Sequence, residues 1–119
     1  MNDSTSETKS SGHGPVAYTV AITFKDSAVA ERFMAWLQDG HLQDVVDAGA
    51  LDARAVILDG EPLRLEARYT FASRSAFEAY ERDHAPRLRE EGLTLFPLDL
   101  GLSYQRSVGE IFAAVIEAP

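Results

Sequence analysis

The segment LDARAVILDGEPLRLEARYTF, from Leu51 to Phe71, contains two runs that are typical of β-strands and a short polar link between them. In the second run, large apolar side chains alternate with charged ones, which is the pattern of a strand with one buried face. The link contains Asp59 and Gly60, a pair that favours the tight turn of a hairpin. We therefore predict an antiparallel hairpin in the middle of the chain.

A third strand precedes this hairpin and a fourth follows it. VAYTVAITF, residues 16–24, places large apolar side chains on one face. LSYQRSVGEIF, residues 102–112, alternates poorly, so two sets of residues are candidates for the open face of the sheet. These sets are Tyr104, Arg106 and Val108, or Gln105, Ser107 and Gly109.

Each half of the chain also contains a helix that the sequence interrupts. After the first strand, apolar residues recur at helical spacing, Asp26 or Ser27 is a candidate cap, and Gly40 should break or kink the helix. In the second half the helix begins at Ser73 or Ser75.

This second helix should end near Asp83, because Pro86 has no amide hydrogen and disfavours a helical conformation of the preceding residue. We expect a new short turn from about Pro86 that stops at Gly92.

The predicted order is strand, helix, strand, strand, helix, strand, which indicates an α+β ferredoxin-like sandwich. Its four-stranded antiparallel sheet would carry two broken helices on one face. We expect the domain to span residues 16–112, after a disordered tail at 1–15 and before an extension at 113–119. The segments DGHLQDVVDAG and RDHAPRLREEG match between the halves, so His41 and His84 occupy equivalent places.

Composition excludes several function classes. The formal charge of -8 disfavours nucleic acid and anionic membranes, and the absence of cysteine excludes thiol chemistry. No apolar run is long enough for a membrane span, and the residues before Val16 lack the features of a secretion signal. We therefore predict a cytoplasmic protein without nucleic-acid or membrane partners.

The two histidines have two interpretations. Either one is a general base, or each ring fills a helix break and bonds a carbonyl that Gly40 or Pro86 frees. The structural interpretation is preferred, because a shared structural role explains a duplicated position better than catalysis does. Their spacing matches no helical zinc motif, so no metal or cofactor is predicted.

Other residues are candidates for a ligand site. Arg106 is assigned to a carboxylate or phosphate group, because packing alone does not explain it. Arg87 and Arg89 form a solvated helix face, unless one points inward as an anion clamp. Trp36 and Tyr80 belong to the core or shape a pocket.

The chain resembles domain-of-unknown-function family 4286, a group of uncharacterised bacterial proteins. The resemblance lies in Trp36-x4-His41-x3-Val45, in His84-Ala85-Pro86-Arg87-Leu88-Arg89-x-x-Gly92 and in an arginine on the last strand. It implies a ferredoxin-like fold of the dimeric α+β barrel type, which elsewhere hosts small mono-oxygenases, haem-handling enzymes and isomerases.

Three hypotheses follow. The first is a non-enzymatic or uncharacterised homodimer that binds a small anionic molecule between helices and sheet. The second is a cofactor-independent oxygenase or isomerase with His84 as its base and Arg106 as its anchor for an anionic group. The third is a protein-interaction module that uses the open sheet face. That face is either solvated or covered by a second subunit.

Overall fold

A computed structural model describes residues 14–116 of the chain. Its strands are β1 (Val16–Phe24), β2 (Asp52–Ile57), β3 (Leu63–Phe71) and β4 (Leu102–Glu110). Its helices are α2 (Ser27–Trp36), α3 (Leu42–Asp47), α4 (Arg74–Asp83) and α5 (Ala85–Leu95), with a π-helical turn η1 (Leu37–His41) and a 3-10 turn η2 (Leu98–Leu100). Most of the predicted tail and the last three residues lie outside the described range, so the predicted domain boundaries stay predictions.

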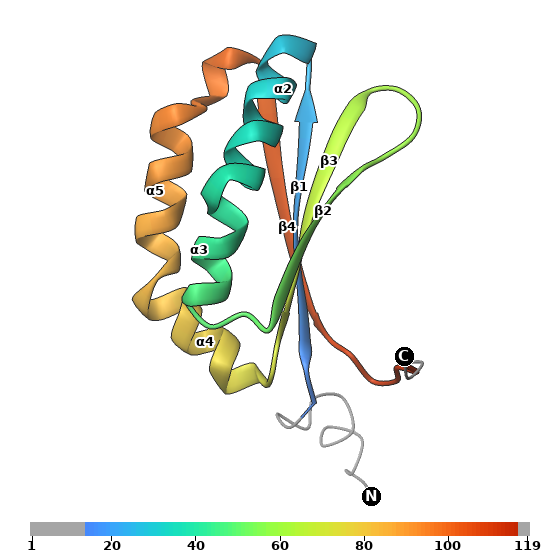
Figure 1. Cartoon of the computed structure of the whole chain (residues 1–119), viewed down its shortest axis with the longest axis vertical. Helices are drawn as coiled ribbons and strands as arrows, with labels where there is room; N and C mark the ends of the chain where they lie inside the picture. Colours follow the sequence, from blue (N-terminus) through green and yellow to red (C-terminus); the bar gives the residue numbers. More distant parts are fainter. Residues whose placement is uncertain (1–13, 117–119) are drawn as a thin grey trace, which may run out of the picture.

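The strands form one antiparallel sheet in the order β2-β3-β1-β4, and the helices cover one of its faces (Figure 1). This arrangement confirms the predicted ferredoxin-like class. The predicted hairpin is β2 and β3, and the first predicted strand has the bounds of β1.

The register of β4 decides which of its side chains lie under the helices. In an antiparallel pair, directly opposite residues point to the same side of the sheet. Arg106 pairs with Val20 and Tyr104 pairs with Ile22, so both belong to the helix-covered face. The open face therefore carries the other candidate set, which is Gln105, Ser107 and Gly109.

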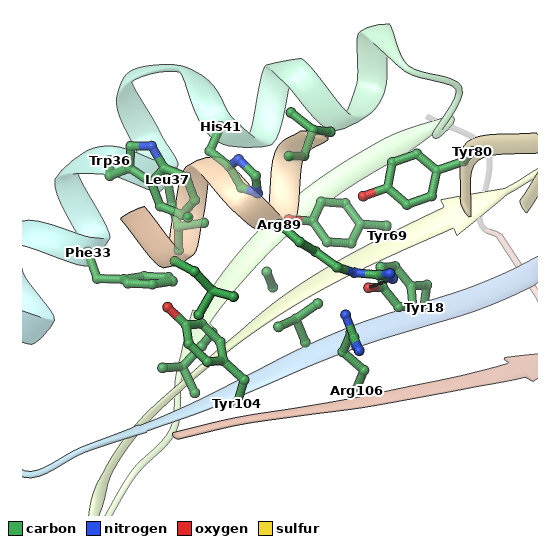
Figure 2. A pocket seen from close by; sticks show the side chains of 16 residues that line it. Tyr18, Phe33, Trp36, Leu37, His41, Tyr69, Tyr80, Arg89, Tyr104 and Arg106 are labelled. Carbon is green, nitrogen blue, oxygen red and sulfur yellow. Dashed lines mark hydrogen bonds between the residues drawn. The ribbon is translucent and has the colours of Figure 1, made fainter. Parts of the chain in front are cut away.

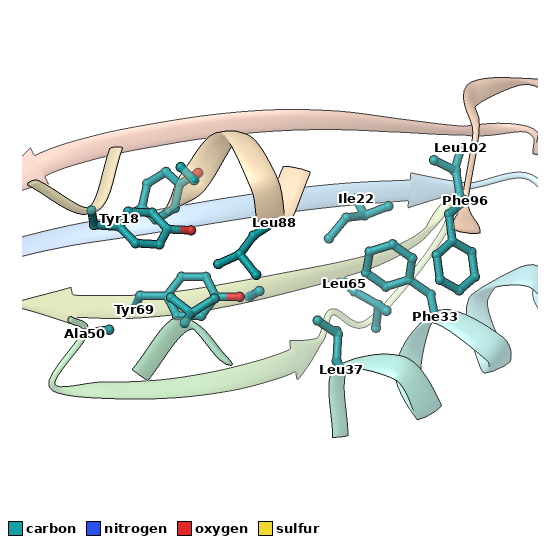
Figure 3. Close-up of a cluster of buried hydrophobic side chains, with 14 of the residues drawn as sticks. Tyr18, Ile22, Phe33, Leu37, Ala50, Leu65, Tyr69, Leu88, Phe96 and Leu102 are labelled. Carbon is teal, nitrogen blue, oxygen red and sulfur yellow. The ribbon is translucent and has the colours of Figure 1, made fainter. Parts of the chain in front are cut away.

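The core lies between the helices and the sheet (Figure 3). Phe33 of α2 packs at one end of this core, where its ring centroid is 5.5 Å from that of Phe24 and 4.8 Å from that of Phe96. Burial of each such large side chain contributes roughly 1.5–3 kcal/mol. The largest fully buried side chains are those of Phe71, Ile22, Leu65, Val16 and Val45.

The first helix begins and breaks as predicted. Asp26 is its cap, and its Oδ1 accepts a hydrogen bond of 2.8 Å from the amide of Ala28. The break is η1, which contains Gly40 and ends at His41. A π-helical turn holds one more residue than an α-helical turn, so it shifts the side chains that follow around the helix axis.

The second helix differs from the prediction at its far end. It is capped by Ser73, and α4 ends at Asp83 as predicted. However, α5 continues through Gly92 to Leu95, so the predicted stop at Gly92 is wrong. Glycine costs a helix about 1 kcal/mol relative to alanine, and packing of neighbours such as Leu88 offsets this cost.

Candidate functional site

A cavity of about 390 Å³ lies between the helices and the sheet (Figure 2). Its walls come from α2 and η1 on one side, from α4 and α5 on another, and from β1, β3 and β4 below. Four residues predicted as site residues line it: His41, Trp36, Tyr80 and Arg106.

Two arginines form a cationic end of this cavity. Arg89 of α5 donates a hydrogen bond of 3.2 Å to Tyr18 Oη and pairs with the carboxylate of Glu81 on α4. Arg106 reaches the cavity from β4, with its guanidinium on the side of Arg89 (Figure 2). Within residues 14–116, Arg106 makes no ion pair or hydrogen bond. The cationic end therefore has one compensated arginine and one uncompensated arginine.

A second recess of about 220 Å³ adjoins the cationic end. Glu81, Arg89 and Arg106 all line it, together with Ser107 and Val108 of β4. Arg106 is exposed, so it lies where the cavity opens to solvent. Two positive charges and one negative charge give this end a net charge of about +1, opposite in sign to the formal -8 of the whole chain.

Three tyrosines surround the cationic end. The ring centroid of Tyr18 is 5.8 Å from that of Tyr69 and 6.2 Å from that of Tyr80. Burial raises the pKa of Tyr69 and of Tyr80 far above the usual range of a phenol. Both phenols therefore keep their protons near neutral pH and can donate hydrogen bonds to an anion.

An aromatic pair forms another part of the cavity wall. The rings of Trp36 and His41 are stacked, with centroids 4.0 Å apart and an interplanar angle of 20°. They are five residues apart, and a π-helical turn bonds residues at this interval, so η1 brings the imidazole over the indole. In the second half, Tyr80 and His84 are only four residues apart, and no such stack forms among the described residues.

His41 has the chemistry of a neutral, largely buried ring. Its Nδ1 is buried and has no hydrogen-bond partner among the residues that the structure describes. Burial lowers the pKa of His41, and the nearby Asp44 carboxylate opposes this effect. The neutral imidazole can accept or donate a hydrogen bond, depending on its tautomer.

The other two predicted site residues lie away from the cavity. His84 occupies the junction of α4 and α5, and its Nδ1 accepts a hydrogen bond of 3.2 Å from Arg87 Nη2. Neither His84 nor Arg87 is part of the cavity lining. In the part of the chain that the structure describes, neither histidine side chain bonds a freed carbonyl, which is the contact that the structural interpretation predicted.

Of Arg87 and Arg89, it is Arg89 that points inward. A helix that continues to Leu95 places Ala85, Leu88, Arg89, Gly92 and Phe96 toward the sheet, whereas Arg87 stays exposed. The signal for this face is the spacing of its small and apolar residues. This spacing is recognisable only if the helix continues past Gly92.

The described residues contain no group of three or more potential metal ligands. None of the helices in residues 14–116 has the length and apolar character needed to cross a bilayer.

The fold and the cavity beneath its helices define a ferredoxin-like protein of the α+β class. The chain matches the family described as Domain of unknown function (DUF4286) over residues 16–103, and it therefore belongs to this family. The matched region ends shortly before Arg106. No curated protein matches the sequence.

Solved structures with this fold have distant sequences. A dimeric ferredoxin-like protein from an uncultured marine organism is 15% identical, covers 86% of this chain and 99% of its own, and gives a TM-score of 0.65. SnoaB, a cofactor-independent oxygenase from Streptomyces nogalater, is 11% identical, with coverages of 87% and 99% and a TM-score of 0.65. A monooxygenase of Streptomyces coelicolor in complex with nanaomycin D is 15% identical, with coverages of 89% and 95% and a TM-score of 0.65. At these identities the likeness shows the fold alone.

Proposed function

We propose that this protein binds a small molecule with a flat, mostly apolar body and one anionic group, in the cavity between helices and sheet. The observation that carries the proposal is Arg106, whose guanidinium reaches the cavity without an ion pair among the described residues. A guanidinium binds a carboxylate through two parallel hydrogen bonds, which makes it a specific anchor for such a group.

The remaining wall suits an apolar body. Phe33, Trp36 and Tyr104 contribute rings, and Leu37 and Leu88 contribute aliphatic surface. A volume of about 390 Å³ falls in the range of small-molecule sites, which combine apolar walls with a few polar groups. The proposal therefore places the anionic group at Arg106 and the apolar body against the aromatic wall.

A catalytic role is the alternative. The position of His41 in the cavity wall makes His41, rather than His84, the candidate base. His41 lines the cavity and has a buried Nδ1 without a partner among residues 14–116, whereas His84 lies outside the lining. An oxygenase or isomerase built on this site would therefore use His41 as its base. Binding alone requires no base, so it remains the primary proposal.

The proposed oligomer is a homodimer that packs through the open faces of two sheets. Structural neighbours described as dimeric ferredoxin-like proteins support a homodimer. Ala21 lies on this face at the centre of β1, between Glu66 and Gln105. Sedimentation velocity should give a dimer for the wild type and a monomer for Ala21→Arg, because the new side chain would separate the faces. A monomeric wild type would instead favour the third hypothesis, in which this face binds another protein.

Calorimetric titration with 2-naphthoate tests the ligand proposal. The wild-type protein should bind this flat carboxylate, and Arg106→Gln should weaken binding by about tenfold or more, as loss of a charge-assisted hydrogen bond implies. Arg54→Gln is the matched control, because it removes the same charge from the open face of β2. Absence of binding by the wild type, or equal binding by Arg106→Gln, would contradict the proposal.

A further inference from the structure

One ion pair connects the two halves of the broken second helix at the mouth of the cavity. Glu81 belongs to α4, Arg89 belongs to α5, and the helix break at His84 lies between them. About a third of each paired side chain is accessible, 32% for Glu81 and 33% for Arg89. The pair is therefore partly shielded from water, and its charges act on nearby groups more strongly than fully exposed charges do.

The side chains of Glu81, Arg89 and Arg106 lie around one small recess. All three line the recess beside the cavity, and all three influence the ionisation of Tyr80. Arg89 pairs with Glu81 and donates to the hydroxyl of Tyr18, while Arg106 makes no hydrogen bond or ion pair within the described residues. An incoming anion therefore meets one free guanidinium, one occupied guanidinium and one carboxylate.

This inventory of charges favours one class of anion. A monoanion at Arg106 neutralises the net charge of about +1 and leaves the pair of Glu81 and Arg89 intact. A dianion leaves one negative charge uncompensated, and it repels the Glu81 carboxylate in the same recess. Arg89 keeps an Nε that is unbonded among the described residues, but its charge is already balanced by Glu81, so the second negative charge would meet a neutral pair.

We infer that Glu81 is a specificity-determining residue that makes the site select carboxylates over phosphate monoesters. This inference rests on the proposed function, because it concerns the same cavity. Glu81 achieves selection without contact to the ligand body: its carboxylate holds Arg89 and opposes a second negative charge.

The test compares two probes that share one apolar body, 2-naphthoate and 2-naphthyl phosphate. At pH 8 the carboxylate carries one negative charge and the phosphate carries nearly two, since its second pKa is about 6. Dissociation constants are measured by calorimetry at low ionic strength. Wild-type protein should bind the carboxylate more tightly.

Glu81→Gln is the decisive variant, because it keeps the shape of the side chain and raises the net charge of the recess to about +2. The ratio of the two dissociation constants should move toward the phosphate by about tenfold or more. Glu81→Asp keeps the charge and should keep the preference for the carboxylate. Glu78→Gln is the matched control, because it removes an exposed charge from the same helix outside the recess.

Each outcome separates the two proposals. If neither probe binds to the wild type or to Glu81→Gln, the proposed function fails. If both probes bind and their ratio is the same in the wild type and in Glu81→Gln, the inference about Glu81 is overturned while the proposed function stands. If Glu81→Gln does not fold, Arg89→Gln provides a second test. Here Glu81 and Arg106 cancel, so the phosphate should lose more affinity than the carboxylate, and equal losses would overturn the inference.

Discussion

The indole of Trp36 lies directly over the backbone of Gly92. A Cβ built on Gly92 would be 3.2 Å from Trp36 Cη2, which is closer than side chains normally pack. The absence of a side chain at residue 92 therefore allows α2 and α5 to approach each other. This contact also fixes the indole that stacks on His41, so it supports one wall of the cavity.

We predict that Gly92→Val destabilises the protein by roughly 1–3 kcal/mol, the usual cost of overpacking. Urea unfolding gives the free energy of unfolding, and fluorescence of the single tryptophan reports on the indole in the same sample. Thr94→Val is the control, because residue 94 is exposed on the same helix and such changes cost less than about 0.5 kcal/mol. Equal free energies of unfolding for the two variants would show that the contact is not restrictive.

The neutral state of His41 predicts a pH dependence of stability. Because burial lowers the folded-state pKa of His41 below 6.5, the unfolded chain takes up this proton first as the pH falls. Stability due to the neutral ring is therefore complete above pH 6.5 and decreases as the pH falls toward the folded-state pKa. We expect His41→Gln to lose less stability than wild type between pH 7.5 and pH 5 in urea unfolding.

An NMR titration of the His41 ring provides an independent check on this sign. Its midpoint should lie below 6.5 in the wild type, and lower still in Asp44→Asn, because the Asp44 carboxylate raises the pKa of His41. A midpoint at 6.5 would mean that the ring is better solvated than its buried position indicates, and a midpoint above 6.5 would mean that it is better paired.

The cap of α4 is one of two serines that the sequence offers as alternatives. Ser73 Oγ accepts a hydrogen bond of 3.1 Å from the amide of Ala76, whereas among the described residues the Ser75 side chain hydrogen-bonds only the Ser73 hydroxyl, at 3.1 Å. Ser73→Ala should cost about 1 kcal/mol and Ser75→Ala should cost less than about 0.5 kcal/mol. Thermal unfolding of both variants measures the difference, and the reverse order would place the helix start at Ser75.

The hydroxyl of Tyr104 satisfies the carbonyl that ends α5. It donates a hydrogen bond of 3.1 Å to the carbonyl oxygen of Phe96, and burial raises the pKa of Tyr104 to about 12, so the donor stays protonated. Tyr104→Phe should therefore lower the free energy of unfolding by about 1 kcal/mol. Tyr80→Phe is the control, because the Tyr80 hydroxyl has no hydrogen-bond partner among residues 14–116. Equal effects of the two variants would contradict this role of Tyr104.

The sequence predicted strands better than it predicted the site. Alternation in residues 16–24 and 63–71 is strong, because one face of each strand is buried, and these strands have the expected bounds. In β4, the cavity admits polar side chains such as Arg106 to the covered face, so hydrophobic alternation carries little information there. Which side chains of β4 face the helices could therefore be assigned only from the pairing of β4 with β1.

The inward direction of Arg89 was not predictable from the sequence for a related reason. Gly92 resembles a helix end in sequence, although it marks a close contact between helices, and this contact depends on Trp36 from the other half of the chain. Without the continued helix, Arg87 and Arg89 have no assigned faces. The break at His84 was predictable, because the effect of Pro86 on the backbone is local.

The alternation of β4 restricts how relatives of this protein can vary. Arg106 reaches the cavity while its neighbours Gln105 and Ser107 face the opposite side of the sheet. An insertion or deletion of one residue between Leu102 and Arg106 would move the guanidinium to the outer face, whereas a change of two would keep it inside. Within this strand, a binding site of this kind therefore tolerates length changes only in even steps.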